Sequence, residues 1–177
     1  MFTYLILDVI LTFHFTDPEG AKQISKLKNL RSLELTFSVE EHGLEEQDMI
    51  NMFANYNMAN LEFLSLAGFD TSIVTDELIG VIADNCPKLY YFNLYKAQLI
   101  GNDCIGYLIR KLANLHYLSV PKCSDLDTEF MYHSVKRSPS EKLKIYTIDG
   151  VIVWNKAKGK AFLDCDDWSS WDAYFGM

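Results

Sequence analysis

The sequence predicts an α/β fold: a solenoid of about five to six repeats, with parallel strands on its concave face and helices on its convex face. The first observation behind this prediction is a recurring skeleton, L-x-x-L-x-L, in which other apolar residues can replace leucine. It occurs at residues 30–35, 61–66, 89–94 and 115–120, and in weaker copies at 10–15 and 143–148. The second observation is that stretches with a helical spacing of apolar residues lie between the copies.

The spacing and periodicity of the skeleton indicate the type of repeat. Successive copies begin 20 to 31 residues apart, which straddles the range of leucine-rich repeats. At its centre each copy alternates apolar and other residues, a period typical of a strand with one buried face. We therefore expect one strand per copy, parallel to its neighbours. The apolar residues 1–11 are read as the end of a repeat, because they lack the basic region of a signal peptide and are too short to span a membrane.

Helices are expected between the strands. The clearest one has a buried stripe at the spacing i, i+3, i+4 and i+7, formed by Ile105, Leu108, Ile109 and Leu112. A second helix is expected over about 76–85, with Thr75 as its N-cap. Further helices are expected near 44–56 and 127–136, and from Pro18, because proline suits the first turn of a helix.

The repeat pattern stops near residue 148, which divides the chain. We expect a leucine-rich repeat solenoid over residues 1–148 and a C-terminal cap or tail over residues 149–177. A solenoid leaves its last apolar face open, so an atypical terminal segment is expected to cover it. The covering side chains would be Trp154, Phe162 and Trp168. The alternative is a partner-binding tail, in which these aromatic side chains are exposed.

The composition argues against several classes of function. The net charge of −8 and the pI near 4.9 disfavour nucleic-acid binding, which needs a basic surface. The four cysteines lie far apart and form no C-x-x-C pair, so they predict neither a zinc ribbon nor a disulfide framework. Reduced thiols are typical of the cytoplasm and the nucleus, and we expect a cytoplasmic or nuclear protein with no membrane partner.

The sequence contains no recognisable catalytic or metal-binding pattern. The acidic cluster Asp164, Asp166 and Asp167 lacks the glycine and the distal glutamate of an EF-hand. The four histidines share no metal-ligand spacing, and there is no nucleophile elbow, P-loop or dinucleotide fingerprint. We therefore expect no metal, no cofactor and no catalytic residues, and we predict that the protein is not an enzyme.

The concave face of the predicted sheet carries the candidate site. Side chains that alternate with the buried leucines point away from the core and form columns across the strands. The column just before the second leucine contains Thr12, Ser32, Phe63, Tyr91, Tyr117 and Ile145. The next column contains His14, Glu34, Ser65, Asn93, Ser119 and Thr147.

Five residues of this face are predicted to bind a protein partner: Phe63, Tyr91, Tyr95, Tyr117 and Asn93. Three of the aromatics follow one another in successive repeats, and Tyr95 is expected to join them laterally. Aromatic residues are enriched at the centres of protein interfaces. The alternative is that tyrosines occur here because they suit strands.

Several repeats also share features outside the strands. The most complete copy contains Leu61-x-x-Leu64-x-Leu66, Val74-Thr75-Asp76, Ile82-Ala83 and Cys86-Pro87-x-Leu89, and a later copy contains Leu115-x-x-Leu118-x-Val120-x-x-Cys123. These elements resemble the cysteine-containing leucine-rich repeats of F-box/LRR proteins, in the ribonuclease-inhibitor-like superfamily. The resemblance covers about residues 10–148. Other repeats depart from it at the cysteine position, with Ser38, Phe69 and Ala97.

The resemblance implies a function. In F-box/LRR proteins the repeats form the substrate-recognition surface of a cullin ubiquitin ligase, while a separate F-box docks the Skp adaptor. We therefore expect a non-catalytic protein–protein interaction module, with Skp–cullin partners if an F-box lies outside this chain. The alternative is a leucine-rich repeat inhibitor, regulator or scaffold that binds a partner enzyme outside the ubiquitin pathway.

Overall fold

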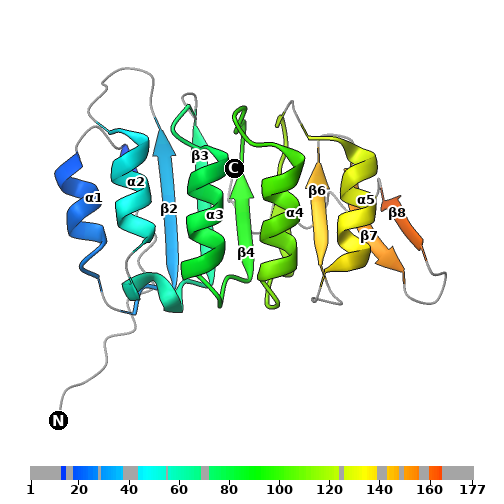
Figure 1. The fold of residues 1–177 in the computed structure, drawn as a ribbon, viewed down its shortest axis with the longest axis horizontal. Coiled ribbons are helices and arrows are strands. Elements are labelled where there is room, and N and C mark those ends of the chain that lie inside the picture. Colours follow the sequence, from blue (N-terminus) through cyan, green and yellow to red (C-terminus); the bar gives the residue numbers. More distant parts are fainter. Residues whose placement is uncertain are drawn as a thin grey trace, which may run out of the picture.

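The structure is a computed structural model that describes residues 13–14, 18–27, 29–37, 44–54, 56–68, 72–123, 126–138, 143–147, 150–155 and 160–164. It confirms the predicted α/β class (Figure 1). The strands are β1 (Phe13–His14), β2 (Ser32–Phe37), β3 (Phe63–Gly68), β4 (Tyr91–Leu94), β5 (Tyr117–Ser119), β6 (Lys144–Thr147), β7 (Gly150–Asn155) and β8 (Lys160–Asp164). The helices are α1 (Pro18–Ile24), α2 (Glu46–Phe53), α3 (Asp76–Asn85), α4 (Asn102–Lys111) and α5 (Thr128–Arg137), with a 3₁₀ helix η1 (Tyr56–Asn60).

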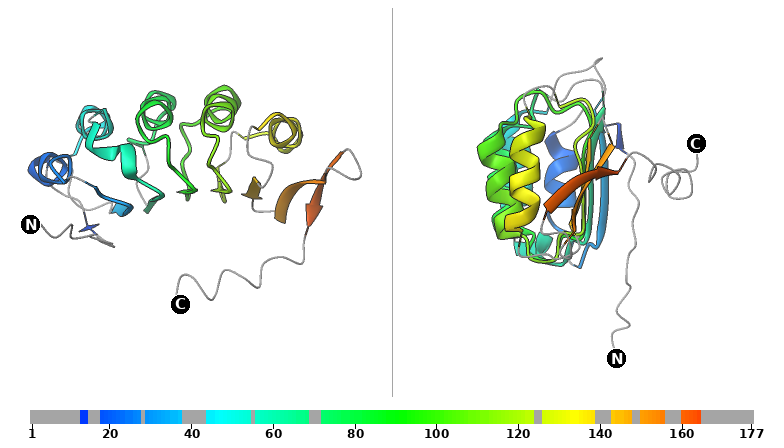
Figure 2. Two further views of the ribbon diagram at one scale, coloured as in Figure 1. Left: turned by 90° about the horizontal axis from the view of Figure 1, so that it is seen from below. Right: turned by 90° about the vertical axis from the view of Figure 1, so that its right-hand side faces the viewer.

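The strands form one open sheet in which they follow the order of the chain, β1-β2-β3-β4-β5-β6-β7-β8. From β1 to β6 every neighbouring pair is parallel. Figure 2 shows the helices in a row along the outer side of a shallow arc and the strands along the inner side. Among the described residues, no helix lies on the other face of the sheet. We call this other face the open face.

The core lies between the sheet and the helices. The skeleton residues of β2 and β3 that face the helices are all at most 1% exposed: Leu33, Leu35, Leu64 and Leu66. They belong to the same buried cluster as Ile82 of α3 and Leu108 of α4, both 0% exposed. Full burial of such a side chain stabilises the fold by about 1.5–3 kcal/mol. The apolar residues of the strands and those of the helices therefore pack into one continuous apolar layer.

The described helices agree with most of the predicted ranges. Helix α4 buries the predicted stripe, and α3 begins after Thr75, whose hydroxyl accepts a backbone N–H of the first turn at 3.3 Å. Helix α2 is shorter than predicted, because it ends at Phe53 and the chain then tightens into η1, which begins at Tyr56. The tighter turn carries Met58, which is 0% exposed, into the core.

The predicted register of the last repeat is wrong by one residue. Lys144, not Ile145, pairs with Tyr117 on the neighbouring strand. Ile145 therefore faces the helices and is 0% exposed, and by the same shift Tyr146 takes the place predicted for Thr147. A slip of one residue exchanges the two faces of a strand. The observed register buries the hydrocarbon of Ile145 in the core and leaves the Lys144 ammonium group on the open face.

The register of the weak first copy also differs from the prediction. Phe13 pairs with Leu35 and His14 with Thr36, which is two residues further along β2 than expected. His14 therefore does not share a level with Glu34. This copy contains no leucine at either of the later skeleton positions, so its apolar pattern specifies the register weakly. The rest of the copy lies outside the described residues.

The sheet reverses direction beyond β6. Strand β7 pairs with β6 and β8 pairs with β7, both antiparallel, so the segment predicted as a cap or tail, residues 149–177, begins with a hairpin that extends the sheet. Ile152 of this hairpin is 0% exposed, and α5 packs against both of its strands. Of the predicted covering groups, Trp168 and the side chains of Trp154 and Phe162 lie outside the described part of the chain.

Candidate functional site

The open face carries the predicted aromatic column. Strand pairing places five residues at one level across β2 to β6: Ser32, Phe63, Tyr91, Tyr117 and Lys144. The next level on the same face contains Glu34, Ser65, Asn93, Ser119 and Tyr146. The predicted alignment of the three aromatics is thus confirmed, whereas Lys144 and Tyr146 join the face through the corrected register.

The aromatic rings of the open face form two stacked pairs. Phe63 and Tyr91 lie parallel, with 4.2 Å between ring centroids and 7° between planes. Tyr117 stacks on Tyr146 at 6.2 Å and meets Tyr90 edge-on at 5.4 Å. Each such contact contributes about 0.5–1.5 kcal/mol beyond area burial. Phe63 and Tyr117 are therefore each held by ring contacts, Phe63 with Tyr91 and Tyr117 with Tyr146 and Tyr90.

Exposure varies along the column. Tyr91 is 6% exposed, whereas Phe63 and Tyr117 are half-buried. Burial, together with the nearby Glu34 and Tyr146, raises the pKa of the Tyr91 phenol above its usual range. An enclosed ring of this kind supports its neighbours and offers little surface to a partner. Of the three predicted aromatics, Phe63 and Tyr117 are the ones that present surface.

Asn93 is oriented by its neighbour in the second level. Its side-chain N–H donates to Oγ of Ser65 at 3.1 Å. Ser65 and Ser119, on either side of Asn93, are 4% and 2% exposed, while Asn93 is half-buried. The two small serines that flank Asn93 are therefore buried, and the Asn93 amide is more exposed than either of them.

Tyr95 lies beyond the end of β4 and contacts two lysines. The Lys122 ammonium donates to the Tyr95 hydroxyl at 3.0 Å. The Nζ atoms of Lys96 and Lys122 lie 5.5 and 5.3 Å from the centroid of the Tyr95 ring. The hydrogen bond from Lys122, followed by the charges of both lysines, lowers the pKa of the Tyr95 phenol. We call Tyr95, Lys96 and Lys122 the Tyr95 cluster.

The two lysines occupy equivalent places in successive turns. Each has a φ of 62°, and each follows the third skeleton position, Leu94 or Val120, by two residues. The backbone N–H of Lys96 donates to the carbonyl of Pro121 at 3.1 Å, which ties the turns together. Aligning the turns as well as the strands would have revealed this pair in the sequence.

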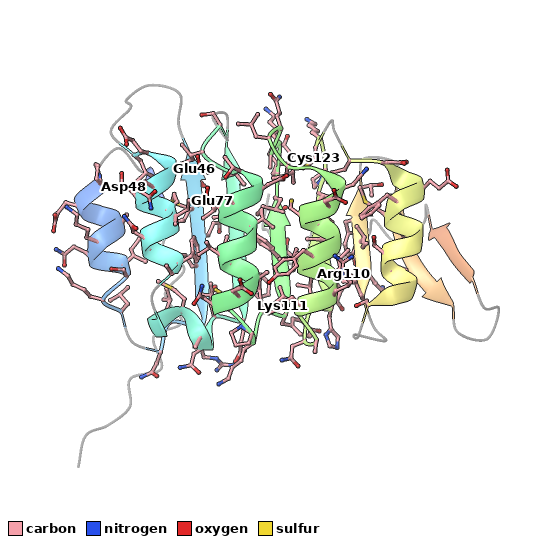
Figure 3. The ribbon with its side chains drawn as sticks, viewed as in Figure 1. Glu46, Asp48, Glu77, Arg110, Lys111 and Cys123 are labelled. Carbon is pink, nitrogen blue, oxygen red and sulfur yellow. The ribbon has the colours of Figure 1, made fainter. Side chains whose placement is uncertain are left out.

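The helix side carries charges that stabilise the helices. Figure 3 shows Glu46 and Glu77 near the upper ends of α2 and α3, and Arg110 and Lys111 near the lower end of α4. Acidic groups at helix N-termini and basic groups at C-termini complement the helix dipole. Lys111 also bonds to Asp84 of α3 at 2.8 Å. These charges therefore have a structural role.

The described cysteines are poor nucleophiles. Burial raises the pKa of the Cys86 thiol to about 12, and it raises the pKa of the Cys123 thiol to about 12 as well. The pKa of the Cys104 thiol is also raised, by burial and by a hydrogen bond with Asp76. A thiol reacts as its thiolate, so these groups are largely unreactive near neutral pH.

The described ranges lack the residue groupings of two other kinds of site. They contain no group of three or more His, Cys, Asp or Glu side chains placed to hold a metal ion. None of their helices combines the length and the apolar character needed to cross a membrane. No protein family and no curated protein matches the chain. The open face and the Tyr95 cluster are the two candidate binding surfaces of the described residues.

Proposed function

We propose that the chain is a leucine-rich repeat solenoid that binds a segment of a partner protein on its open face. The repeat assignment is supported by strand–helix units that follow one another across the sheet while the skeleton leucines face the helices. The binding role rests on one observation. An aromatic level that includes Phe63 and Tyr117 lies on the face that no described helix covers.

The chemistry of the open face suits a segment with apolar or aromatic side chains. Phe63 and Tyr117 present ring surface that is already ordered by stacking, so a partner would pay little side-chain entropy to use it. Asn93 and Lys144 add polar groups beside the rings, and these can fix the register of a bound backbone. Aromatic anchors next to ordered polar groups are the usual composition of interface hot spots.

The perturbed groups support binding more than catalysis. Burial raises the pKa of the Tyr91 phenol and the Cys86 thiol, which makes both groups weaker nucleophiles near neutral pH. An activated nucleophile needs the opposite shift or an adjacent base. Tyr91 and Cys86 are therefore unsuited to nucleophilic attack, and we propose that the protein acts by binding.

The likeness to F-box/LRR repeats supports a particular pathway, substrate recognition for a cullin ubiquitin ligase. Affinity capture of the protein followed by mass spectrometry would recover Skp and cullin subunits if this proposal holds. Recovery of an intact enzyme that the chain inhibits would favour the alternative role of inhibitor or regulator.

The open face is tested by Tyr117→Ala. We expect this substitution to weaken partner capture by about tenfold or more, because truncation of an aromatic hot spot typically costs at least 1–2 kcal/mol. The matched control is Tyr107→Ala, which removes a tyrosine that is 37% exposed on helix α4. Equal capture by the two variants, both with native circular dichroism, would contradict binding at the open face.

A further inference from the structure

The Tyr95 cluster concentrates positive charge in an acidic protein. The chain carries a net charge of −8, yet two ammonium groups converge on one ring at 5.5 and 5.3 Å. Glycine and asparagine tolerate a φ of 62° better than lysine does. The backbone of the turns therefore does not explain the choice of lysine. The arrangement favours an acidic segment as the occupant.

The chain contains such a segment outside the described residues. Residues 165–177, which we call the tail, include Asp166, Asp167 and Asp172 and no basic residue. They also include four aromatic residues: Trp168, Trp171, Tyr174 and Phe175. Carboxylates pair with ammonium groups, and aromatic rings stack on tyrosine and attract cations through their faces. The carboxylates of the tail thus suit the lysines of the cluster, and its aromatic rings suit the Tyr95 ring.

The tail begins at the same edge of the sheet as the Tyr95 cluster. Asp164, the last residue of β8, pairs with Val151, and Val151 pairs with Tyr146. Tyr146 continues this level through Ser119 to Asn93. Because β8 is antiparallel to β7 and β7 to β6, β8 runs in the direction of β4. The chain therefore leaves β8 at the edge where β4 and β5 end and the Tyr95 cluster begins.

The distance can be spanned by the tail. Four strand spacings separate β8 from β4 in the sheet order, which amounts to about 19 Å at 4.8 Å per spacing. Asp172 lies eight residues beyond Asp164, and an extended chain of that length reaches about 28 Å. A tethered segment of this kind meets its site at an effective concentration on the order of millimolar. Weak ionic and aromatic contacts are then sufficient for binding.

We propose that the acidic, aromatic tail binds the Tyr95 cluster of its own chain, with Asp172 paired to Lys96 and Lys122. The contact itself needs no partner, so it stands or falls independently of the proposed function.

The experiment uses the full chain and zero-length carbodiimide cross-linking, which joins carboxylates to amines that are in contact. An equal mixture of ¹⁵N-labelled and unlabelled protein distinguishes links within one molecule from links between two. We expect links from tail aspartates to Lys96 or Lys122 within one molecule. Links confined to Lys156, Lys158 and Lys160 would overturn the proposal, as would links found only between molecules, which would indicate a second copy as the occupant.

A second readout tests the role of the charge. Replacing Lys96→Asn and Lys122→Asn together removes both cations and keeps residues that tolerate a positive φ. We expect this double variant to increase acrylamide quenching of tryptophan fluorescence, because Trp168 and Trp171 become more accessible. The control is Lys88→Asn, at the opposite edge, where Lys88 bonds to Asn60 at 2.7 Å. Intramolecular links together with increased quenching support the proposal, and the absence of either overturns it.

Discussion

Burial and neighbouring charges both shift the pKa values of single residues in this chain. Cys86 is 0% exposed, and burial raises the pKa of its thiol to about 12. The Cys123 thiol donates a hydrogen bond to the carbonyl of Leu94 at 3.0 Å. The same cause raises the pKa of Tyr91, whereas Tyr95, in an exposed turn, has its pKa lowered by lysines. Two tyrosines four residues apart therefore differ because one is enclosed and the other faces cations.

The shifted thiol predicts a loss of stability at alkaline pH. The folded chain keeps the Cys86 proton up to about pH 12, whereas the unfolded chain releases it near pH 9.0. Between these values the unfolded state binds fewer protons, so the free energy of unfolding falls as pH rises, by up to about 1.4 kcal/mol per pH unit. Cys86→Ala should flatten this slope in urea titrations between pH 9 and pH 11. Parallel slopes for the variant and the parent would contradict the shift.

At the scale of elements, the helices were the most predictable part of the chain. The stripe of α4 and the Thr75 cap of α3 depend on residues within a few positions of one another. The end of α2 was less predictable, because the turn into η1 depends on burying Met58 in the common core. Local spacing thus indicates that a helix exists, and packing decides where it ends.

Two helical glycines give an element-scale prediction. A Cβ added at Gly106 of α4 would lie 2.7 Å from Cζ of Phe130 on α5, whereas one added at Gly80 of α3 meets nothing within 4 Å. We expect Gly80→Ala to stabilise the protein by about 0.5–1 kcal/mol through helix propensity. We expect Gly106→Ala to destabilise it by about 1 kcal/mol, because overpacking costs about 1–3 kcal/mol and outweighs the same gain.

Thermal and urea unfolding of the two glycine variants provide the measurement. Gly80→Ala is the control for the intrinsic effect of alanine, so the difference between the variants isolates the contact of α4 with α5. Equal stabilisation of both variants would show that Phe130 moves aside without cost.

At the scale of the whole molecule, the last strands extend the sheet beyond the parallel part. The hairpin of β7 and β8 pairs with β6 and reverses the strand direction. Without it, β6 would replace β8 as the edge strand of the described sheet, and exposed edges favour pairing between molecules. Antiparallel pairing beyond Thr147 was not visible in the sequence, because the repeat skeleton stops there and the partner of each strand is set by the sheet.

Truncation tests the role of the hairpin. A chain that ends after Thr147 should associate or aggregate as its concentration rises, and should melt at a lower temperature than the parent. A chain that ends after Asp164 keeps every described element and serves as the control. Size-exclusion chromatography with light scattering distinguishes the two. A monomeric, equally stable short chain would show that β7 and β8 are dispensable.

The sequence by itself determined the alternation of strands and helices, the buried stripes and the alignment of Phe63, Tyr91 and Tyr117. These features follow from periods of two and 3.6 residues, which are properties of neighbouring positions. Only the tertiary structure decided that Tyr91 is enclosed and that Tyr146 joins the open face. It also decided that two lysines gather around Tyr95. The physical reason is that strand register and the packing of successive turns depend on lateral contacts between repeats, which apolar spacing along the chain does not specify.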